Sequence, residues 1–429
     1  MRYLYSALLY CLLPFILLRM LLRSRRAPAY RRRLAERFGV LPVDPQRGER
    51  PAIWVHAVSV GEALAAAPII ESLLERYPDC RLVVTTTTPT GSERIQALFT
   101  DRVFHVYAPW DLPGAVGRFM KRVKPELLLI LETELWPNML HHCRRRGCRV
   151  VLANARMSAR SAAGYQRFAG LSRVMLESVN MVACQSVADS ERLLTLGLPA
   201  SQLAVTGSIK FDLELDALLR SEAQALQSAW AVGGRSILVA ASTHPGEDEQ
   251  ILAAFKQLRQ RVDNCLLVLV PRHPERFDAV FDLCGEAGWR VLRRSEGRVP
   301  AADVDIVVGD TMGELLLLLS PASVAVIGGS LVEHGGHNVL EASAWGVPVV
   351  TGPHMFNFAE ISDMLTEAGG MVQLEDPATL GACLIELFTD QQRREQMGAI
   401  GQQVVADNRG AKKRLLALID AQLRAGRAN

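Results

Sequence analysis

From about residue 50 onward, short β-branched runs alternate with helix-like stretches, and this alternation is the feature that most constrains the fold. Such alternation is typical of parallel α/β units, in which each strand is followed by a covering helix. A polar, helix-prone stretch near residues 213–234 interrupts it and divides the strands into two series. We therefore predict an α/β fold of two doubly wound, Rossmann-like domains facing across a cleft. The expected strands are residues 53–57, 82–86, 103–106, 127–131, 150–153, 181–184 and 203–205, then 237–241, 266–270, 304–308, 324–327, 348–350 and 371–372.

The segments outside these series complete the predicted domain organisation. The sequence suggests a membrane anchor at 1–24, a basic juxtamembrane segment at 25–50, a first domain at 51–212 and a linker at 213–235. The second domain is expected to cover 236–429, with terminal helices after about residue 390. No repeat, low-complexity tract or Gly/Ser-rich linker is visible.

The amino terminus carries the signals of a membrane anchor. Residues 3–18 are uncharged and mostly apolar, which is close to the shortest length that crosses a bilayer, and Pro14 lies within them. A basic cluster follows the apolar run, whereas a cleavable signal peptide carries its charge before it. The positive-inside rule places the arginines that follow, and the residues after them, in the cytoplasm. An amphipathic helix lying in the membrane interface is the alternative. The basic cluster consists of Arg23, Arg25, Arg26, Arg31, Arg32, Arg33 and Arg37.

Composition and motif searches exclude several classes of protein. With 49% hydrophobic residues and a net charge of +3, the chain is neither disordered nor a general nucleic-acid binder. The eight cysteines lack metal-ligand spacing and are interpreted as core thiols. No GxxxxGK[ST] loop occurs, and no GxGxxG follows the first strand, which argues against kinases, ATPases and ordinary dehydrogenases. Asp303 and Asp305 form a DxD pattern, but they precede a strand, where a solvated strand start is a simpler explanation than a metal site.

Glu62 is the strongest catalytic candidate. It follows the strand at 53–57 and the turn residue Gly61, and it opens a helix-like stretch. Ligands of open α/β sheets bind at the carboxyl ends of the strands, so a carboxylate here is well placed for catalysis. The structural alternative is an acidic residue in a first helical turn, favoured by the helix dipole. Glu132 and Glu134 follow the strand at 127–131 and therefore belong to the same edge. We expect them to hold substrate hydroxyls; capping of the next helix is the structural alternative.

The second half has three turns suited to an anion. Arg272 and Arg276 follow the strand at 266–270, and guanidinium groups recognise phosphate in a bidentate manner. A second turn contains Gly313, near which backbone N–H groups could contact a phosphate. A third, glycine-rich turn leads to Asn338 and Glu341, which share a helix face and could hold phosphate and ribose hydroxyls. Solvated arginines, helix caps and plain turn geometry are the structural alternatives.

These residues stand in motifs that resemble one enzyme family almost from end to end. The chain contains WVHAVSVGE, ETELWPN, NARMS, GSIKFD, PRHPERF, GDTMGEL, IGGSL and GGHNVLE. In this wording it resembles the 3-deoxy-D-manno-octulosonic acid (Kdo) transferases of lipopolysaccharide biosynthesis. The resemblance implies a B-type glycosyltransferase fold, CMP-Kdo as donor, the lipid A precursor lipid IVA as acceptor, and attachment to the cytoplasmic face of the inner membrane. We expect no cofactor, no metal and no nucleic-acid partner, and inner-membrane lipids as surroundings.

The resemblance also assigns roles to residues. The general base falls on Glu62, and Ser330 and Lys210 are further candidate anion contacts. Glu132 and Glu134 remain candidate substrate contacts because of their position at a strand exit. Val339 stands where many relatives are expected to carry proline, which backbone contacts tolerate. The CMP contacts fall on Pro271, Arg272, Met312, Gly313, Glu314, Asn338, Val339, Leu340 and Glu341.

Two other functional classes remain open at this stage. One is a different B-type enzyme that acts on a UDP-sugar, either a transferase or an epimerase. The other is a membrane-bound scaffold without activity, which would not need a glutamate at a strand exit and several anion-binding turns. The number of Kdo residues added, the acyl chains required and the oligomeric state are not encoded in these motifs.

Overall fold

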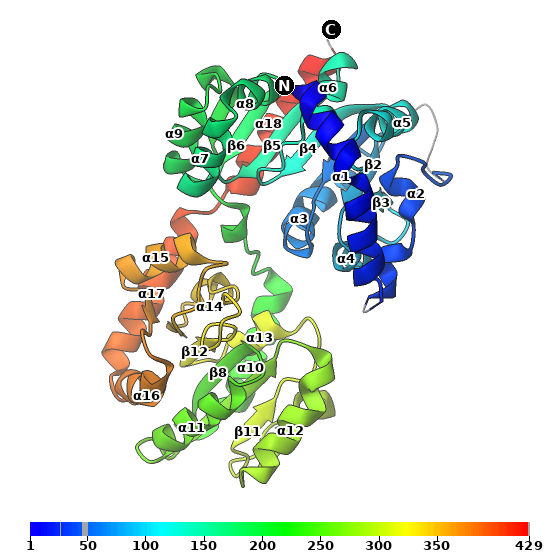
Figure 1. The fold of residues 1–429 in the computed structure, drawn as a ribbon. Helices are drawn as coiled ribbons and strands as arrows, with labels where there is room; N and C mark the ends of the chain where they lie inside the picture. Colours follow the sequence, from blue (N-terminus) through cyan, green and yellow to red (C-terminus); the bar gives the residue numbers. More distant parts are fainter. Residues whose placement is uncertain (26, 45–49, 428–429) are drawn as a thin grey trace. The chain divides into compact units, whose positions relative to one another are not determined.

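The computed structural model describes residues 1–25, 27–44 and 50–427. The chain forms two compact units, Met1–Asp212 with Arg409–Asn429, and Leu213–Asn408 (Figure 1). Each unit is built around one parallel, seven-stranded sheet flanked by helices.

The first unit has the strand order β3-β2-β1-β4-β5-β6-β7, and all pairings are parallel. The order reverses direction between β1 and β4, as in doubly wound folds. All residues of β1 and β2 are buried, because helices cover both faces of a parallel sheet. The strands are β1 (Ala52–His56), β2 (Arg81–Thr86), β3 (Phe104–Tyr107), β4 (Pro125–Leu131), β5 (Arg149–Ala155), β6 (Met181–Cys184) and β7 (Leu203–Val205).

Helices bury two separate apolar clusters on the two faces of this sheet. One face is covered by α3, α4 and α18, and the other by α5, α6, α8 and α9. The helices of this unit are α1 (Arg2–Arg23), α2 (Leu34–Arg37), α3 (Val60–Arg76), α4 (Pro89–Phe99), α5 (Pro113–Val123), α6 (Pro137–Arg145), α7 (Ala159–Arg167), α8 (Ala169–Leu176), α9 (Val187–Thr195) and α18 (Ala411–Arg427).

The last helix was expected in the second domain, but α18 returns to the first unit, where it lies beside β4, β5 and β6 (Figure 1). Its apolar stripe, which includes Leu415 and Ile419, is fully buried against this sheet. The carboxylate of Asp212 accepts backbone N–H groups of Gly410 and Lys412 at the start of the helix. By its contacts α18 therefore groups with the first unit, because burial of this stripe outweighs sequence proximity to the second unit.

The second unit has the strand order β10-β11-β9-β8-β12-β13-β14, again entirely parallel. Its order reverses between β8 and β12. The strands are β8 (Ser236–Thr243), β9 (Cys265–Pro271), β10 (Val291–Arg293), β11 (Ile306–Val308), β12 (Val324–Ile327), β13 (Val349–Thr351) and β14 (Met371–Gln373).

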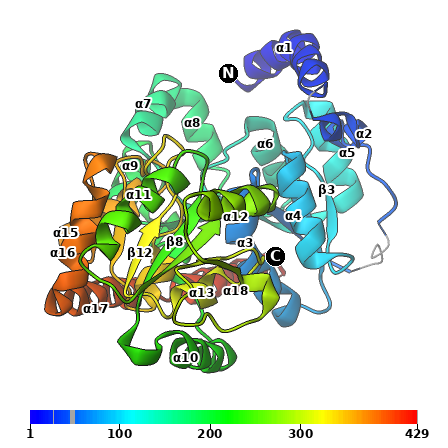
Figure 2. The ribbon, with the colours of Figure 1, turned by 90° about the horizontal axis from the view of Figure 1, so that it is seen from below.

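Helices α11, α12 and α16 contribute to one apolar cluster on this second sheet. Figure 1 and Figure 2 both show α11 near β8, whereas α12 lies beside β10 and β11. The helices are α10 (Ala217–Trp230), α11 (Asp248–Arg259), α12 (Phe277–Glu286), α13 (Leu315–Leu319), α14 (Leu340–Ala344), α15 (Ala359–Ala368), α16 (Leu380–Thr389) and α17 (Gln391–Asp407). The expected linker at 213–235 is mostly α10, which belongs to this compact unit.

The thirteen predicted strands are confirmed, with ends shifted by a few residues. Strand β10 (Val291–Arg293) was missed, because three residues are too short for a periodic signal and the strand forms only by pairing with β11. Asp303 and Asp305 stand before β11, where they pair with Arg290 and Arg259. The structural interpretation of the DxD pattern agrees with these ion pairs.

The basic juxtamembrane segment is partly a folded element. Arg33 pairs with Glu36 and donates to the carbonyl oxygen of His105. Arg37 is only 4% exposed and donates to the carbonyl oxygen of Thr87 at 2.9 Å. These two arginines are thus bound to partners within the first unit. Arg26 and residues 45–49 lie outside the described residues.

The apolar run at the amino terminus forms α1 (Arg2–Arg23), a helix long and apolar enough to cross a membrane by length and composition. Its mean hydropathy is 1.9.

Candidate active site

Glu62 lies where the order of the first sheet reverses. It follows β1, while Glu132 and Glu134 follow β4, the neighbouring strand on the other side of the reversal. At such a switch point the connections leave to opposite faces of the sheet, so a crevice opens outside the strand ends. Three carboxylates predicted separately from sequence therefore share one edge of the first unit.

Glu62 also has a structural role. It is the third residue of α3, whose N-cap is Ser59, and the two residues form a capping box. The hydroxyl of Ser59 donates to Glu62 Oε1 at 2.8 Å, and the backbone N–H of Val58 donates to Oε2 at 2.7 Å. The first helical turn suits an acidic side chain, as the alternative interpretation stated. These bonds hold the carboxylate in one orientation.

The protonation behaviour of Glu62 differs from that of an ordinary helix cap. The residue is 8% exposed, and burial raises its pKa to about 7. Hydrogen bonds from Val58 and Ser59 oppose this rise, whereas the neighbouring carboxylates Glu132 and Glu134 add to it. A carboxyl group that titrates near neutral pH is suited to accept a proton and later release it.

Glu132 leaves β4 in an unusual backbone conformation, with φ +57°. A residue other than glycine, asparagine or aspartate in this left-handed region costs about 1 kcal/mol or more, and such strain is concentrated at functional sites. The next carboxylate, Glu134, accepts a hydrogen bond from the indole of Trp136 at 2.9 Å. The Trp136 ring in turn meets His56, the last residue of β1, edge to face at 4.8 Å.

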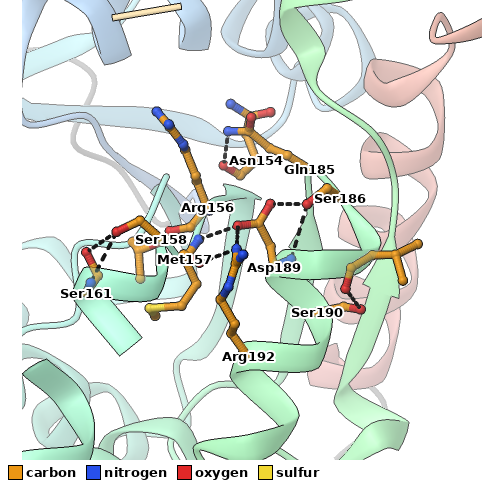
Figure 3. A network of polar contacts seen from close by, with 12 residues as sticks. Asn154, Arg156, Met157, Ser158, Ser161, Gln185, Ser186, Asp189, Ser190 and Arg192 are labelled. Atoms are coloured by element: carbon orange, nitrogen blue, oxygen red, sulfur yellow. Dashed lines mark hydrogen bonds and ion pairs between the residues drawn. The ribbon is translucent and has the colours of Figure 1, made fainter. Parts of the chain in front are cut away.

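A polar network fixes the NARMS motif at the next strand exit (Figure 3). The buried carboxylate of Asp189 accepts the backbone N–H of Met157 at 2.7 Å and the hydroxyl of Ser186 at 2.5 Å. Asn154, with φ +55°, uses its side-chain oxygen to bind the backbone N–H of Ile209. This bond holds the short turn Ile209–Phe211, which carries Lys210, against the end of β5.

In the second unit, four histidines gather where the sheet order reverses between β8 and β12. His244 follows β8, and its Nε2 lies 2.8 Å from Nε2 of His337, which follows β12. The rings of His273 and His334 also lie against His244, with centroids 5.5 and 4.3 Å away. The pKa of His244 is lowered to about 4 and that of His337 to about 3, first by burial and in addition by the neighbouring histidines and arginines. Both rings are neutral at pH 7.

The backbone of the IGGSL turn after β12 binds a carboxylate of the protein itself, that of Glu247. The Glu247 carboxylate, fully buried, accepts the backbone N–H groups of Gly329, Ser330 and Leu331, as well as that of His244. The hydroxyl of Ser330 donates to the carbonyl oxygen of Ile327 and accepts from the N–H of Gly352. The glycine-rich turn therefore binds negative charge, but the contacts of Ser330 are internal, which argues against its predicted role as a ligand contact.

Arg272 is an exposed cation beside the histidines, at the end of β9. Its backbone N–H donates to the carbonyl oxygen of Thr243 at 3.0 Å, which fixes the turn to the end of β8. After burial, the charge of Arg272 is the next cause that lowers the pKa of His337. The guanidinium group therefore lies close to the histidine cluster.

The charge of Arg272 also affects Glu341, near the start of α14. Burial raises the pKa of Glu341, while Asn338 and Arg272 oppose the rise. Asn338 Nδ2 donates to Glu341 Oε1 at 3.1 Å. Arg272, Asn338 and Glu341 therefore form one cluster in the second unit, and all three were predicted as contacts of the donor.

The other guanidinium group of the turn after β9 has an internal role. Arg276 donates to the carbonyl oxygen of Thr243 at 2.6 Å and pairs with the buried carboxylate of Asp248. The arginine was one of two phosphate candidates in this turn, and its contacts make it a structural residue.

Three of the predicted CMP contacts are buried apolar residues. Pro271 is the last residue of β9, and Val339 and Leu340 lie fully buried at the start of α14. Because their side chains are enclosed, these residues can offer a ligand little beyond their backbone groups.

The GDTMGEL turn is open to solvent. Met312 is 64% exposed, and Gly313 has φ +87° with no atom within 4 Å of the position that a Cβ would take. Glu314 accepts from Arg294 at 2.9 Å and from the hydroxyl of Thr311. The turn thus presents a backbone that a ligand can approach, next to a carboxylate that is already paired.

Sequence reasoning missed His244, His337 and Glu247. A signal was present, because His244-Pro245-Gly246-Glu247 directly follows a strand and contains a turn glycine. Among residues 1–25, 27–44 and 50–427, no group of three or more His, Cys, Asp or Glu side chains is arranged to hold a metal ion.

Comparisons with known proteins identify the family. Residues 32–213 match the family described as 3-deoxy-D-manno-octulosonic-acid transferase (kdotransferase), and residues 247–404 match glycosyl transferases group 1. A 3-deoxy-D-manno-octulosonic acid transferase from Haemophilus influenzae is 42% identical over 98% of this chain and 99% of its own length. The chain belongs to the Kdo transferase family. A second Kdo transferase, from Bordetella pertussis, is 36% identical over 97% of this chain and 98% of its own. The protein is thus an enzyme, a 3-deoxy-D-manno-octulosonic acid transferase.

The fold of this Kdo transferase is shared with more distant enzymes. The crystal structure of MurG from Acinetobacter baumannii matches 87% of this chain and 99% of the MurG chain, with a TM-score of 0.55 and 15% sequence identity. The predicted B-type glycosyltransferase fold is confirmed by this similarity and by the two Rossmann-like sheets.

Proposed function

We propose that this Kdo transferase moves Kdo from CMP-Kdo to the lipid A precursor lipid IVA by inverting, single displacement, with Glu62 as the general base. The observation that carries the proposal is the Glu62 carboxyl at the switch point of the first sheet, with a pKa of about 7. We further propose that the reaction takes place at the cytoplasmic face of the inner membrane.

The acceptor hydroxyl needs a base because an alkoxide cannot form cheaply at neutral pH. Glu62 would remove the proton from the primary hydroxyl of the distal glucosamine while that oxygen attacks the anomeric carbon of Kdo. The bond from this carbon to the phosphate oxygen of CMP breaks in the same step, and CMP leaves. A positioned base contributes about 10² to 10⁴ in rate. The capping box supports this role, because it fixes the orientation of the carboxylate before substrate binds.

The donor half of the reaction is proposed for the second unit. Negative charge grows on the phosphate of departing CMP, and Arg272 offers a guanidinium group that remains exposed. Because His244 and His337 have pKa values of about 4 and about 3, they add hydrogen-bonding groups but no charge at pH 7. Glu341 and Asn338 are proposed to bind the ribose and phosphate, and the open backbone at Gly313 to contact the nucleotide.

Three residues of the first unit are proposed as further substrate contacts. Glu132 and Glu134 would accept hydrogen bonds from sugar hydroxyls beside Glu62. Lys210, on the turn held by Asn154, is the candidate partner of the Kdo carboxylate.

The decisive test is mass spectrometry of lipid IVA after incubation with the purified enzyme and CMP-Kdo. The expected product carries added Kdo, and the mass difference counts the residues transferred. Glu62→Gln should lower the rate by about 100-fold or more, as loss of a general base predicts, while binding of CMP persists. Glu71→Gln is the matched control, because Glu71 lies on the same helix but is partly exposed and pairs with Arg102. A Glu62→Gln enzyme that keeps most of its activity would remove Glu62 from this role.

Nucleotide competition tests the donor separately. CMP should protect the enzyme against thermal unfolding, and UDP should not. Protection by UDP alone would instead favour an enzyme that acts on a UDP-sugar.

A further inference from the structure

One face of α1 is sheltered by the first unit along most of the helix. The sheltered positions recur at intervals of three and four residues, which is the spacing of one helical face. A helix that anchors a domain only through its far end would be exposed all round. The partly or fully buried residues are Arg2, Tyr5, Ser6, Leu9, Leu13, Ile16, Leu17 and Met20.

The amino-terminal end of α1 is bound to the domain by polar contacts. Arg2 Nη1 donates to Asn138 Oδ1 at 3.0 Å, and Asn138 Nδ2 donates to the hydroxyl oxygen of Ser6 at 3.0 Å. Asn138 is fully buried at the start of α6. Its own backbone N–H, and that of Met139, bind the Asp111 carboxylate at 2.9 and 2.7 Å. The first turns of α1 therefore join a buried network of the first unit.

The middle of α1 lines an apolar groove with the same unit. Leu9, Leu13 and Ile16 face Trp110, Leu112 and Trp136, and the groove has a volume of about 210 Å³. Trp136 is the residue that binds Glu134 beside Glu62. The middle of α1 thus lies opposite apolar residues of the same unit whose buried Asn138 binds its first turns.

These contacts are incompatible with a helix that crosses a bilayer. A helix of 22 residues is about 33 Å long, close to the thickness of the hydrocarbon core. If α1 crossed the membrane, Arg2 would lie on the opposite side from the domain that holds Asn138. The amino end of the helix is instead hydrogen-bonded to that domain.

We infer that α1 lies in the plane of the membrane, embedded in one leaflet, and that the enzyme is monotopic. The face of α1 turned away from the protein is apolar and would enter the acyl region of a leaflet rich in anionic lipid. Arg19, Arg23 and Arg25 are exposed at its carboxyl end and would meet the headgroups. The inference does not depend on the donor, the acceptor or the catalytic base. The exposed apolar side chains of α1 are Tyr3, Leu4, Leu8, Tyr10, Leu12, Phe15, Leu18, Leu21 and Leu22.

Protease access to an amino-terminal epitope tests the topology. The full-length enzyme carries the epitope before Met1 and is expressed in a Gram-negative host. In intact spheroplasts the epitope should survive added protease, whereas in inverted inner-membrane vesicles it should be removed. A single-pass protein with an external amino terminus serves as the control. Loss of the epitope in intact spheroplasts would overturn the inference.

A cross-link tests the contact itself in the membrane. In a Cys11→Ser background, Ser6→Cys combined with Asn138→Cys should form an intramolecular disulfide when isolated membranes are treated with mild oxidant. Leu21→Cys with Asn138→Cys is the control, because Leu21 is exposed near the other end of α1. An uncross-linked double variant that is folded would count against the in-plane helix. If the double variant does not fold, the epitope test decides.

Discussion

Replacement of Glu247 by glutamine tests how the glycine-rich turn after β12 is held. Glu247 Oε1 accepts the N–H groups of Ser330 and Leu331, and Oε2 accepts those of His244 and Gly329. Glutamine keeps one oxygen and replaces the other with an NH₂ group, which is a donor. Two buried backbone donors then face a donor and lose their acceptor.

The cost follows from those two donors. Leaving a buried donor unsatisfied costs about 1–3 kcal/mol, so Glu247→Gln should destabilise the turn by about 2–6 kcal/mol. Since about 1.4 kcal/mol corresponds to a factor of ten, the amides of this turn should exchange with solvent roughly 30-fold faster or more. The loss should be felt locally first, because the turn stands beside His337 and the proposed donor site.

Hydrogen exchange followed by mass spectrometry measures this directly in the intact enzyme. Peptides that cover Gly329, Ser330 and Leu331 should lose protection in Glu247→Gln, and peptides of the first unit should not. Glu249→Gln is the matched control, since Glu249 is exposed on the neighbouring helix α11. Unchanged protection of the turn in Glu247→Gln would refute the claim that this carboxylate holds it.

Four further predictions concern the two candidate sites and the stability of the first unit. The rate constant kcat/KM should fall in acid with an apparent pKa near 7, because the protonated Glu62 cannot act as a base; a profile that is flat through neutral pH would contradict this. Glu132→Gly should relieve the strain of the φ +57° conformation and raise the free energy of unfolding by up to about 1 kcal/mol, while lowering activity. The control is Lys124→Gly, at φ +51° on an exposed helix end, which should raise stability and leave activity unchanged. Burial lowers the pKa of His56 to about 3, below its ordinary value of 6.5, so the folded protein favours the neutral ring. The free energy of unfolding should therefore fall as the pH drops below 6.5, by up to about 1.4 kcal/mol per pH unit. In urea unfolding, His56→Gln should lack this dependence of stability on pH. Arg272→Ala should raise KM for CMP-Kdo by about tenfold or more, as loss of a charge-assisted hydrogen bond predicts, with a smaller change in kcat, and an unchanged KM would argue against its contact with the donor.

The strand pattern was readable from sequence because it is local. Long strands such as β4 and β9 are continuous apolar runs with turn residues near their ends, and they were predicted within a few residues. The three-residue strand β10 was not, because pairing with β11 creates it. The same distinction explains why the position of α18 differed from the expectation. Its apolar stripe predicts a buried helix face but does not specify which of the two sheets the helix covers.

Part of the candidate site could be predicted, because its polar and charged residues directly follow strands of the sheets. Glu62, Arg272 and Asn338 were selected as candidates because parallel strands deliver such residues to one edge of a sheet. The partner of the glycine turn was not found, since Glu247 and Gly329 are far apart in sequence and meet only when β8 and β12 become neighbours.

The amino-acid sequence alone determined that the chain is a two-domain α/β protein with an apolar amino terminus and a glutamate at a strand exit. Periodicity, turn residues and motif wording are properties of neighbours along the chain, and they suffice for these conclusions. Only the tertiary structure decided which polar groups satisfy one another. It showed the turn amides bound to Glu247, Arg37 enclosed in the first unit, and Arg2 at the start of α1 bonded to Asn138. Buried polar groups must find partners wherever the folded chain brings them together, and sequence distance does not limit that search.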